Sequence, residues 1–157
     1  LIGMVGGVIG AKVIGIFDFE IISELAFFIP LIAAMGGNVG IQSAAIVVQG
    51  LANDSLKMEN IFQKLVKEFG VGLLNGIICS IIILLIAFGL GYEIALCLTV
   101  SISLLVVIVF AALFGTFIPL ALEKFNIDPA LATGPFITTL NDVLGLLIYF
   151  TIGEAIL

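Results

Sequence analysis

The chain has 157 residues, of which 62% are hydrophobic and 10% are charged, and its formal net charge is −6. Soluble domains are about half apolar with roughly a quarter of their residues charged, so a water-soluble globule is excluded. The acidic balance also excludes a nucleic-acid-binding protein, because such proteins need a basic surface. The composition predicts an all-α integral membrane protein.

Five apolar segments are long enough to cross the bilayer core, which takes about 20 helical residues with a range of roughly 17–25. They are Leu1–Phe17, Ile22–Gly50, Phe69–Gly91, Ile94–Leu122 and Pro129–Leu157. We therefore predict one domain, residues 1–157, with five transmembrane helices. The first residue is Leu1 and already lies in an apolar run, so we expect the chain to be part of a longer protein.

The charged residues predict how this bundle is oriented. Four of the five lysines lie in the two loops that share one side of the membrane, namely Lys57, Lys64, Lys67 and Lys124. The opposite loops carry only acidic charges, at Asp18, Glu20 and Glu93. The positive-inside rule then places the amino terminus in the cytoplasm and the carboxyl terminus outside the cell membrane. Lys12 is the exception, and we expect it to snorkel to the interface.

The lysine-rich break before the third segment has a pattern of its own. Between Leu56 and Phe69, apolar residues recur at the i, i+3 and i+4 positions of an amphipathic helix. We expect this stretch to lie along the membrane surface and then to bend into the third helix. It either anchors the chain or docks a soluble domain.

Small residues recur at every fourth position in two segments. They are Gly3, Gly7, Ala11 and Gly15 in the first, and Gly72, Gly76 and Ser80 in the third. Because this spacing lets helix backbones approach closely, both stripes are predicted to face neighbouring helices.

The second segment contains two features that are unusual in a membrane helix. Pro30 removes a backbone donor, and Gly36, Gly37 and Asn38 follow at the depth of the bilayer centre. One interpretation is a kinked or locally opened helix whose polar groups face a cavity. The other, equally favoured by the pattern, is a tight glycine contact with a structural asparagine.

Asp142 is the most informative residue, because it lies near the middle of the last segment. A carboxylate at the centre of a membrane helix costs about 2.5–3.5 kcal/mol on insertion scales, so such a residue usually faces water, an ion or another subunit. Lys12 is too near the end of its helix to be its partner. The alternative is a protonated structural aspartate that bonds to a neighbouring helix.

The residues around Asp142 indicate which ion it would bind. Glycines and oxygen-bearing side chains surround it at helical spacing, namely Gly134, Thr138, Asn141 and Gly145. Hard cations such as Mg²⁺ and Ca²⁺ prefer oxygen ligands, whereas softer metals prefer the histidine that this chain lacks. Without histidine or a convincing nucleophile–base pair, an enzyme is not expected.

The acidic cluster of Asp18, Glu20 and Glu24 is either a cation-attracting mouth of a pore or an ordinary solvated loop.

Two long runs resemble the signature of the MgtE family of magnesium channels. They are PLIAAMGGNVGIQS from Pro30 to Ser43 and NIDPALATGPFITTLNDVLG from Asn126 to Gly145. A third run, EFGVGLLNG from Glu68 to Gly76, resembles the start of that family's third helix. The resemblance covers essentially the whole chain.

This resemblance implies a homodimeric channel whose pore runs along the dimer axis, lined by segments 22–50 and 129–157. It implies that Asp142 of both subunits holds hydrated Mg²⁺, with Mn²⁺, Co²⁺ or Ca²⁺ as alternative ions. Other residues that it assigns to the ion site are Thr138, Gly145, Gly37 and Asn38. It also implies cytosolic N and CBS domains in the full-length protein, outside these 157 residues. Half of a related eukaryotic solute carrier is a minor alternative.

The chemistry of Mg²⁺ agrees with this implication, because the ion gives up its waters reluctantly and suits acceptors that contact its hydration shell. Two rival functions remain open. One is an ion- or proton-coupled secondary transporter, which also uses broken helices near the bilayer midplane. The other is a non-transporting assembly domain in which Asp142 is a buried bonding residue.

Overall fold

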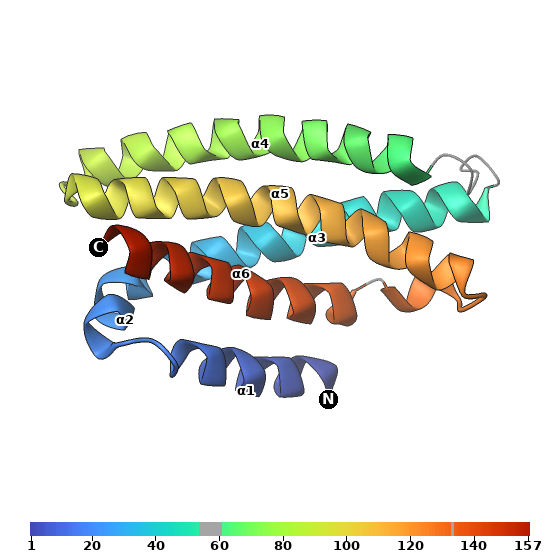
Figure 1. Cartoon of the computed structure of the whole chain (residues 1–157), viewed down its shortest axis with the longest axis horizontal. Coiled ribbons are helices and arrows are strands. Elements are labelled where there is room, and N and C mark those ends of the chain that lie inside the picture. Colours follow the sequence, from blue (N-terminus) through green and yellow to red (C-terminus); the bar gives the residue numbers. More distant parts are fainter. Residues whose placement is uncertain (54–60, 133) are drawn as a thin grey trace.

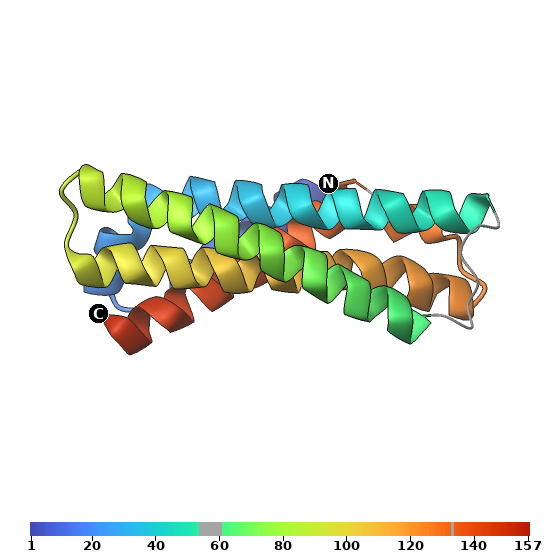
Figure 2. The ribbon, with the colours of Figure 1, turned by 90° about the horizontal axis from the view of Figure 1, so that it is seen from above.

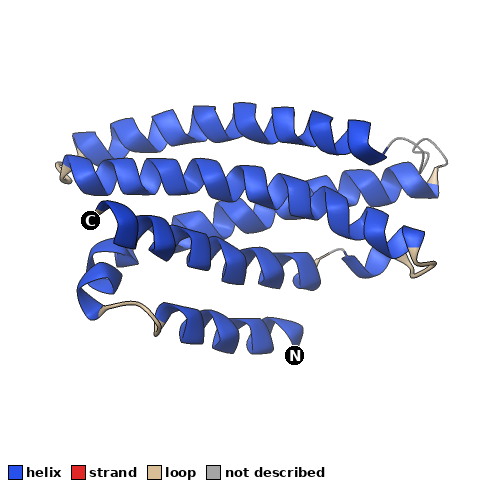
Figure 3. Ribbon diagram, viewed as in Figure 1, coloured by secondary structure: helices blue, strands red, loops and turns tan. Residues whose placement is uncertain are grey.

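The computed structural model of the chain describes residues 1–53, 61–132 and 134–157 and, within them, contains helices and no strand (Figure 3). The α-helices are α1 (Ile2–Ile14), α2 (Phe19–Leu25), α3 (Ile29–Ala52), α4 (Ile61–Gly89), α5 (Ile94–Lys124) and α6 (Pro135–Ile156). Two 3₁₀ turns, Ala26–Phe28 and Pro129–Ala132, precede α3 and α6. Helices α1, α3, α4, α5 and α6 run along the long axis of the molecule, and the short α2 lies at one end of the bundle (Figure 1).

Four helical spans are long and apolar enough to cross a membrane: Phe19–Ala52, Ile61–Gly89, Ile94–Lys124 and Pro135–Ile156. This confirms the predicted all-helical membrane protein. The first predicted span is shorter than expected, since α1 has only 13 residues. A bilayer crossing needs at least about 17 residues, so a fifth transmembrane helix stays a prediction.

Helix α5 is the centre of the bundle and contacts α3, α4 and α6 (Figure 2). Most of its side chains are apolar, and Val100, Leu104 and Ile108 are almost fully buried. Helix α4 contacts mainly α5 and leaves much of its apolar surface exposed, including Leu74 and Leu85. An apolar surface of this kind is what lipid-facing helices present to the bilayer.

The glycine stripe of α4 packs against α5 as predicted. A Cβ atom at Gly72 would lie 3.0 Å from the Ala112 Cβ, and one at Gly76 would lie 2.8 Å from the Leu105 side chain. One turn further on, the Ser80 hydroxyl donates to the Ser101 carbonyl at 2.8 Å, and the Ser101 hydroxyl donates back to the Ser80 carbonyl at 2.9 Å. Close approach and paired hydrogen bonds both hold these helices together.

The prediction for the α1 stripe was wrong. Gly6 and Gly10 are buried against α6, where a Cβ at Gly6 would collide with the Thr139 side chain. A Cβ at Gly3 or Gly7, by contrast, would find no atom within 4 Å. Both sets recur every fourth residue, so spacing alone did not decide which of them faces the neighbour.

Helix α3 is not opened at its glycines, which corrects the first of the two interpretations. It is α-helical throughout Ile29–Ala52, because Pro30 occupies the first turn, where no backbone donor is needed. A Cβ at Gly36 would lie 3.0 Å from the Val107 side chain, and one at Gly115 of α5 would collide with the backbone of Gly40. The alternative of tight glycine contacts is the one that the structure has.

Three boundaries also differ from the predictions. The second predicted segment, Ile22–Gly50, is not one α-helix, because α2 ends at Leu25 and the 3₁₀ turn Ala26–Phe28 separates it from α3. Helix α4 runs from Ile61 to Gly89 without a break, so there is no bend near Phe69; the earlier part of the amphipathic segment, including Lys57, lies outside the described residues. Helix α6 begins at Pro135 and not at Pro129. Gly134 precedes it with a φ of 65°, a conformation that favours glycine and that turns the chain into the helix.

Candidate ion site

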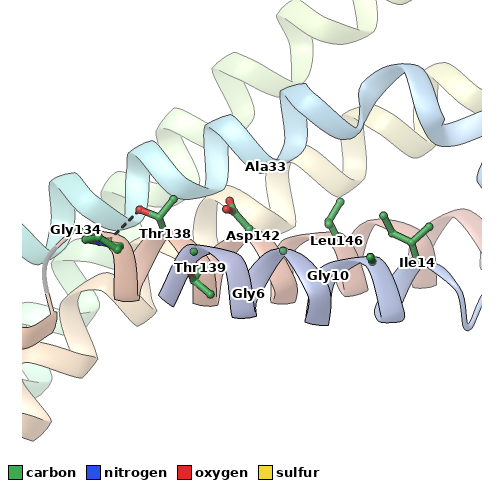
Figure 4. A pocket seen from close by; sticks show the side chains of 13 residues that line it. Gly6, Gly10, Ile14, Ala33, Gly134, Thr138, Thr139, Asp142 and Leu146 are labelled. Carbon is green, nitrogen blue, oxygen red and sulfur yellow. Dashed lines mark hydrogen bonds between the residues drawn. The ribbon is translucent and has the colours of Figure 1, made fainter. Parts of the chain in front are cut away.

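Helices α1, α3 and α6 enclose a cavity of about 620 Å³ (Figure 4). The walls are made mostly of small residues: α1 contributes four glycines and Ala11, and α3 contributes Ala33. Helix α6 supplies the polar groups, among them Thr138, Thr139 and Asp142. The cavity is therefore open because its walls carry small side chains, and Asp142 is the acidic side chain on its wall.

The carboxylate of Asp142 is half-buried and points into this cavity (Figure 4). Within residues 1–53, 61–132 and 134–157, no hydrogen bond or ion pair to this side chain is recorded. Gly37 of α3 faces it closely, because a Cβ there would lie 3.6 Å from an Asp142 oxygen. An unpaired carboxylate beside a cavity can accept hydrogen bonds from water or from the hydration shell of a cation.

Thr138 lies one turn before Asp142 on the same wall. Its hydroxyl donates to the Gly134 carbonyl at 3.0 Å, the bond to the preceding turn that threonine can form in a helix. Its methyl group contacts the position of Gly37, where a Cβ would lie 3.3 Å away. The absence of a side chain at Gly37 thus makes room for both Thr138 and Asp142.

Gly134 also lines the cavity, whereas Asn38, Gly145 and Asn141 do not. Asn38 is exposed, and Gly145 is buried against α5, where an added Cβ would lie 3.4 Å from the Val107 side chain. Asn141 is 2% exposed and packs on Gly40, and neither amide atom has a hydrogen-bond partner in the described part of the chain. The polar stripe predicted around Asp142 is therefore divided between two faces of α6.

Lys64 and Lys124 lie at the opposite end of the bundle from Glu24 and Glu93, as the loop charges predicted, but Glu68 and Glu123 share the end of these lysines. Helix α2, the turn between α4 and α5, and the carboxyl terminus share one end (Figure 1). Glu24 and Glu93 line one surface cavity of about 370 Å³ at that end. The start of α4, which carries Lys64, and the end of α5, which carries Lys124, lie at the other.

One charged side chain at the lysine-bearing end is buried, which the sequence analysis did not predict. Glu68 is only 8% exposed. Lys64 pairs with it at 2.9 Å, and the Ser43 hydroxyl of α3 donates to it at 3.4 Å. The i, i+4 spacing of the two charges was the available signal.

Taken together, the fold and the cavity define a multi-helix integral membrane protein with an unpaired carboxylate inside its bundle, an arrangement typical of proteins that move ions. Comparison with known families agrees. The MgtE family, described as divalent cation transporter, matches residues 29–152. The chain belongs to the MgtE family.

Three similar proteins carry the name Magnesium transporter MgtE. The one from Bacillus subtilis is 37% identical over 151 residues, which is 95% of this chain and 34% of that protein. Those from Thermus thermophilus and Enterococcus faecalis are 36% and 37% identical over 88% and 84% of this chain, and over 30% and 29% of their own lengths. The chain thus spans about a third of the length of the curated relatives it matches.

Proposed function

We propose that this chain forms the membrane domain of a Mg²⁺ channel in which Asp142 of two subunits binds the hydrated ion. The observation that carries the proposal is the unpaired Asp142 carboxylate on the wall of the cavity. Placing such a group at membrane depth costs about 2.5–3.5 kcal/mol on insertion scales, which a bound cation and its waters would offset. The relatives named as magnesium transporters supply the identity of the ion.

The size of the cavity fits an ion that keeps its waters. Six waters occupy about 180 Å³ at about 30 Å³ each, and the cavity has about 620 Å³. Mg²⁺ exchanges its waters reluctantly, so a wide site that contacts the hydration shell avoids the cost of dehydration. We assign the outer-shell contacts to the Asp142 carboxylate and to backbone carbonyls near Thr138 and Gly37. Contacts from Gly145 and Asn38, which the family resemblance also implies, stay a prediction, because both residues lie off the cavity wall.

Charge balance supports a dimer. A single Asp142 offsets half the charge of a divalent cation, and a second copy across a twofold axis supplies the other half. Mn²⁺, Co²⁺ and Ca²⁺ carry the same charge and are the ions against which Mg²⁺ selectivity should be measured.

The distribution of charge also suits inward movement of cations. At the end without Lys64 and Lys124, Glu24 and Glu93 lie on one surface cavity and would raise the local cation concentration outside the cell. The lysine-bearing end would face the cytoplasm, with the amino terminus. A membrane potential of 100 mV then contributes about 4.6 kcal/mol to the entry of a divalent ion, at about 2.3 kcal/mol per charge. The cytosolic N and CBS domains would belong to the part of the relatives that this chain does not span.

The alternative is a secondary transporter in which Asp142 is the ion- or proton-coupled site. Such transporters often have a broken helix at the bilayer centre, whereas α3 is continuous through Gly36, Gly37 and Asn38. Electrical recording separates the two functions, because unitary currents mark a channel and strict coupling to a counter-ion marks a carrier.

The test measures Mg²⁺ influx into vesicles that contain the protein, with a Mg²⁺-sensitive dye inside them. It compares the variant Asp142→Asn with the control variant Glu154→Gln. Both changes remove one carboxylate from α6, but Glu154 is exposed near the end of the helix. Asp142→Asn is expected to lower influx at least tenfold, which corresponds to about 1.4 kcal/mol of lost stabilisation of the ion. Glu154→Gln is expected to lower it less than twofold.

A second measurement addresses the hydration of the ion. Hexaamminecobalt(III) cannot release its six ligands, so it is expected to block influx in the unmodified protein and to bind the Asp142→Asn variant more weakly. Unchanged influx in Asp142→Asn would reject the ion site. If that variant instead weakened only the association of subunits, the assembly-domain interpretation would be the correct one.

A further inference from the structure

We propose that a water molecule is bound where α3, α4 and α5 meet, and that it joins the Thr116 hydroxyl to the Glu68 carboxylate. This water site takes no part in the proposed ion path, since neither residue lines the cavity of Asp142. Two observations carry the proposal: a buried ion pair, and a buried hydroxyl that has no hydrogen-bond partner in the described part of the chain.

Glu68 links two helices at the lysine-bearing end of the bundle. Lys64 of its own helix pairs with it at 2.9 Å, and the Ser43 hydroxyl of α3 donates to it at 3.4 Å. A carboxylate can accept about four hydrogen bonds, so these two partners leave capacity for another donor. Because Lys64 already balances the negative charge, a further ligand in this buried place should be neutral and not a cation.

The Thr116 hydroxyl is fully buried in α5, and within residues 1–53, 61–132 and 134–157 no protein group bonds to it. Other threonines of the bundle satisfy their hydroxyls within their own helix. Those of Thr99 and Thr138 donate to the carbonyl four residues earlier, at 2.9 Å and 3.0 Å. A buried hydroxyl without a hydrogen bond is costly, so Thr116 indicates a partner from outside the chain.

The packing of α4 on α5 brings Thr116 to the level of Glu68. The two helices run in opposite directions (Figure 1). A Cβ at Gly72 of α4 would lie 3.0 Å from the Ala112 Cβ of α5. Glu68 lies one turn before Gly72, and Thr116 lies one turn after Ala112, so both side chains occupy the same level of this interface.

Pro119 provides a third polar group at this level. It lies inside α5 and is buried. Proline has no N–H, so the carbonyl of Gly115, four residues earlier, does not receive its usual helical hydrogen bond. A water that accepts from Thr116 and donates to Glu68 and to the Gly115 carbonyl would make about three hydrogen bonds, as buried waters typically do.

The consequence is a hydrated polar joint that holds α3 against α4. Toward the other end of the bundle, Met35 of α3 and Ile83 of α4 line an apolar groove of about 180 Å³. The hydrogen bond from Ser43 to Glu68 joins the two helices directly. By fixing the Glu68 carboxylate from the side of α5, the water would hold it in reach of Ser43.

The test compares Thr116→Val with the control Thr99→Val by reversible unfolding in mixed micelles at increasing SDS. Both threonines are fully buried in α5, and valine keeps their shape without the hydroxyl. Loss of a hydroxyl that binds the water should raise the equilibrium constant for unfolding at least about fivefold. Thr99→Val should change it less than about twofold, because that hydroxyl bonds only within its own helix. Removing an unsatisfied hydroxyl would stabilise the protein, so a constant that is unchanged or lower in Thr116→Val would overturn the proposal.

Two further measurements identify the partner of Thr116. When Lys64→Met and Glu68→Leu together replace the ion pair, adding Thr116→Val should change the unfolding constant less than about twofold, and an undiminished effect would reject Glu68 as the partner. A density map that resolves ordered water should show one water within about 3.5 Å of both the Thr116 hydroxyl and the Glu68 carboxylate. A direct hydrogen bond between these two side chains, with no water between them, would reject the bound water.

Discussion

The contact between Gly6 and Thr139 makes the placement of α1 testable by a change of one methyl group. An alanine at Gly6 would drive its Cβ into the Thr139 methyl group and bring it within 3.0 Å of the Thr139 hydroxyl oxygen. Overpacking of this kind costs about 1–3 kcal/mol. The neighbouring change Gly7→Ala is the matched control, because its Cβ meets no atom within 4 Å.

The expected changes in the free energy of unfolding combine two opposing contributions. Replacing glycine by alanine inside a helix favours folding by about 0.8–1.0 kcal/mol, and this applies to both variants. Gly7→Ala is therefore expected to raise the free energy of unfolding by up to about 1 kcal/mol. Gly6→Ala carries the overpacking cost as well, so it is expected to be less stable than Gly7→Ala by about 1–3 kcal/mol.

A third variant shows whether Thr139 is the cause. Thr139→Ser removes the methyl group that the new Cβ would strike, so the double variant with Gly6→Ala should recover at least about 0.5 kcal/mol relative to additivity. The assay is reversible unfolding in mixed micelles at increasing SDS. Equal stability of Gly6→Ala and Gly7→Ala, or no recovery in the double variant, would refute the packing of α1 on α6 and with it the shape of the cavity.

Two further predictions concern polar contacts between helices. A double-mutant cycle of Ser80→Ala and Ser101→Ala should give a coupling energy between about 0.6 and 1.7 kcal/mol in the same unfolding assay, because each serine both donates and accepts across the α4–α5 interface; zero coupling would contradict this. Lys64→Met should destabilise the protein more than Glu68→Gln, because the first leaves a buried carboxylate without its cation, whereas the second leaves an amide that still accepts from Ser43. The reverse order of stability would contradict the burial of Glu68.

The all-helical membrane fold and the special position of Asp142 were predictable, because burying apolar runs and placing a carboxylate in a membrane both involve large free energies. An apolar run of about 20 residues or more is long enough to cross the bilayer as a helix, which satisfies its own backbone hydrogen bonds, and the boundaries of α5 were predicted closely for this reason. A carboxylate in such a run needs an explanation, and the structure places Asp142 on a cavity. The α4 stripe was predictable too, because Gly72, Gly76 and Ser80 have no competing small-residue face.

The rotation of helices was not predictable where two faces looked alike. In α1, one series of small residues begins at Gly3 and another at Gly6, and only the partner helix distinguishes them. In α3, the same glycines suited either an opened helix or a tight contact. The outcome depended on Gly115, which lies 75 residues or more away in the sequence and allows the backbone of Gly40 to approach α5.

The glycines of α3 determine where the Asp142 side chain of α6 points, through the packing of the two helices. Asn141 and Asp142 are consecutive, so their side chains leave the helix about 100° apart. Asn141 enters the tight contact with Gly40, where any larger residue would collide with its amide. Because that contact fixes the rotation of α6, Asp142 is directed at Gly37 and the cavity. A buried amide without a hydrogen-bond partner, such as that of Asn141, costs about 1–3 kcal/mol of folding free energy. The protein therefore loses stability at Asn141 and Gly40 while these residues orient the Asp142 carboxylate, and neither of them needs to touch the ion.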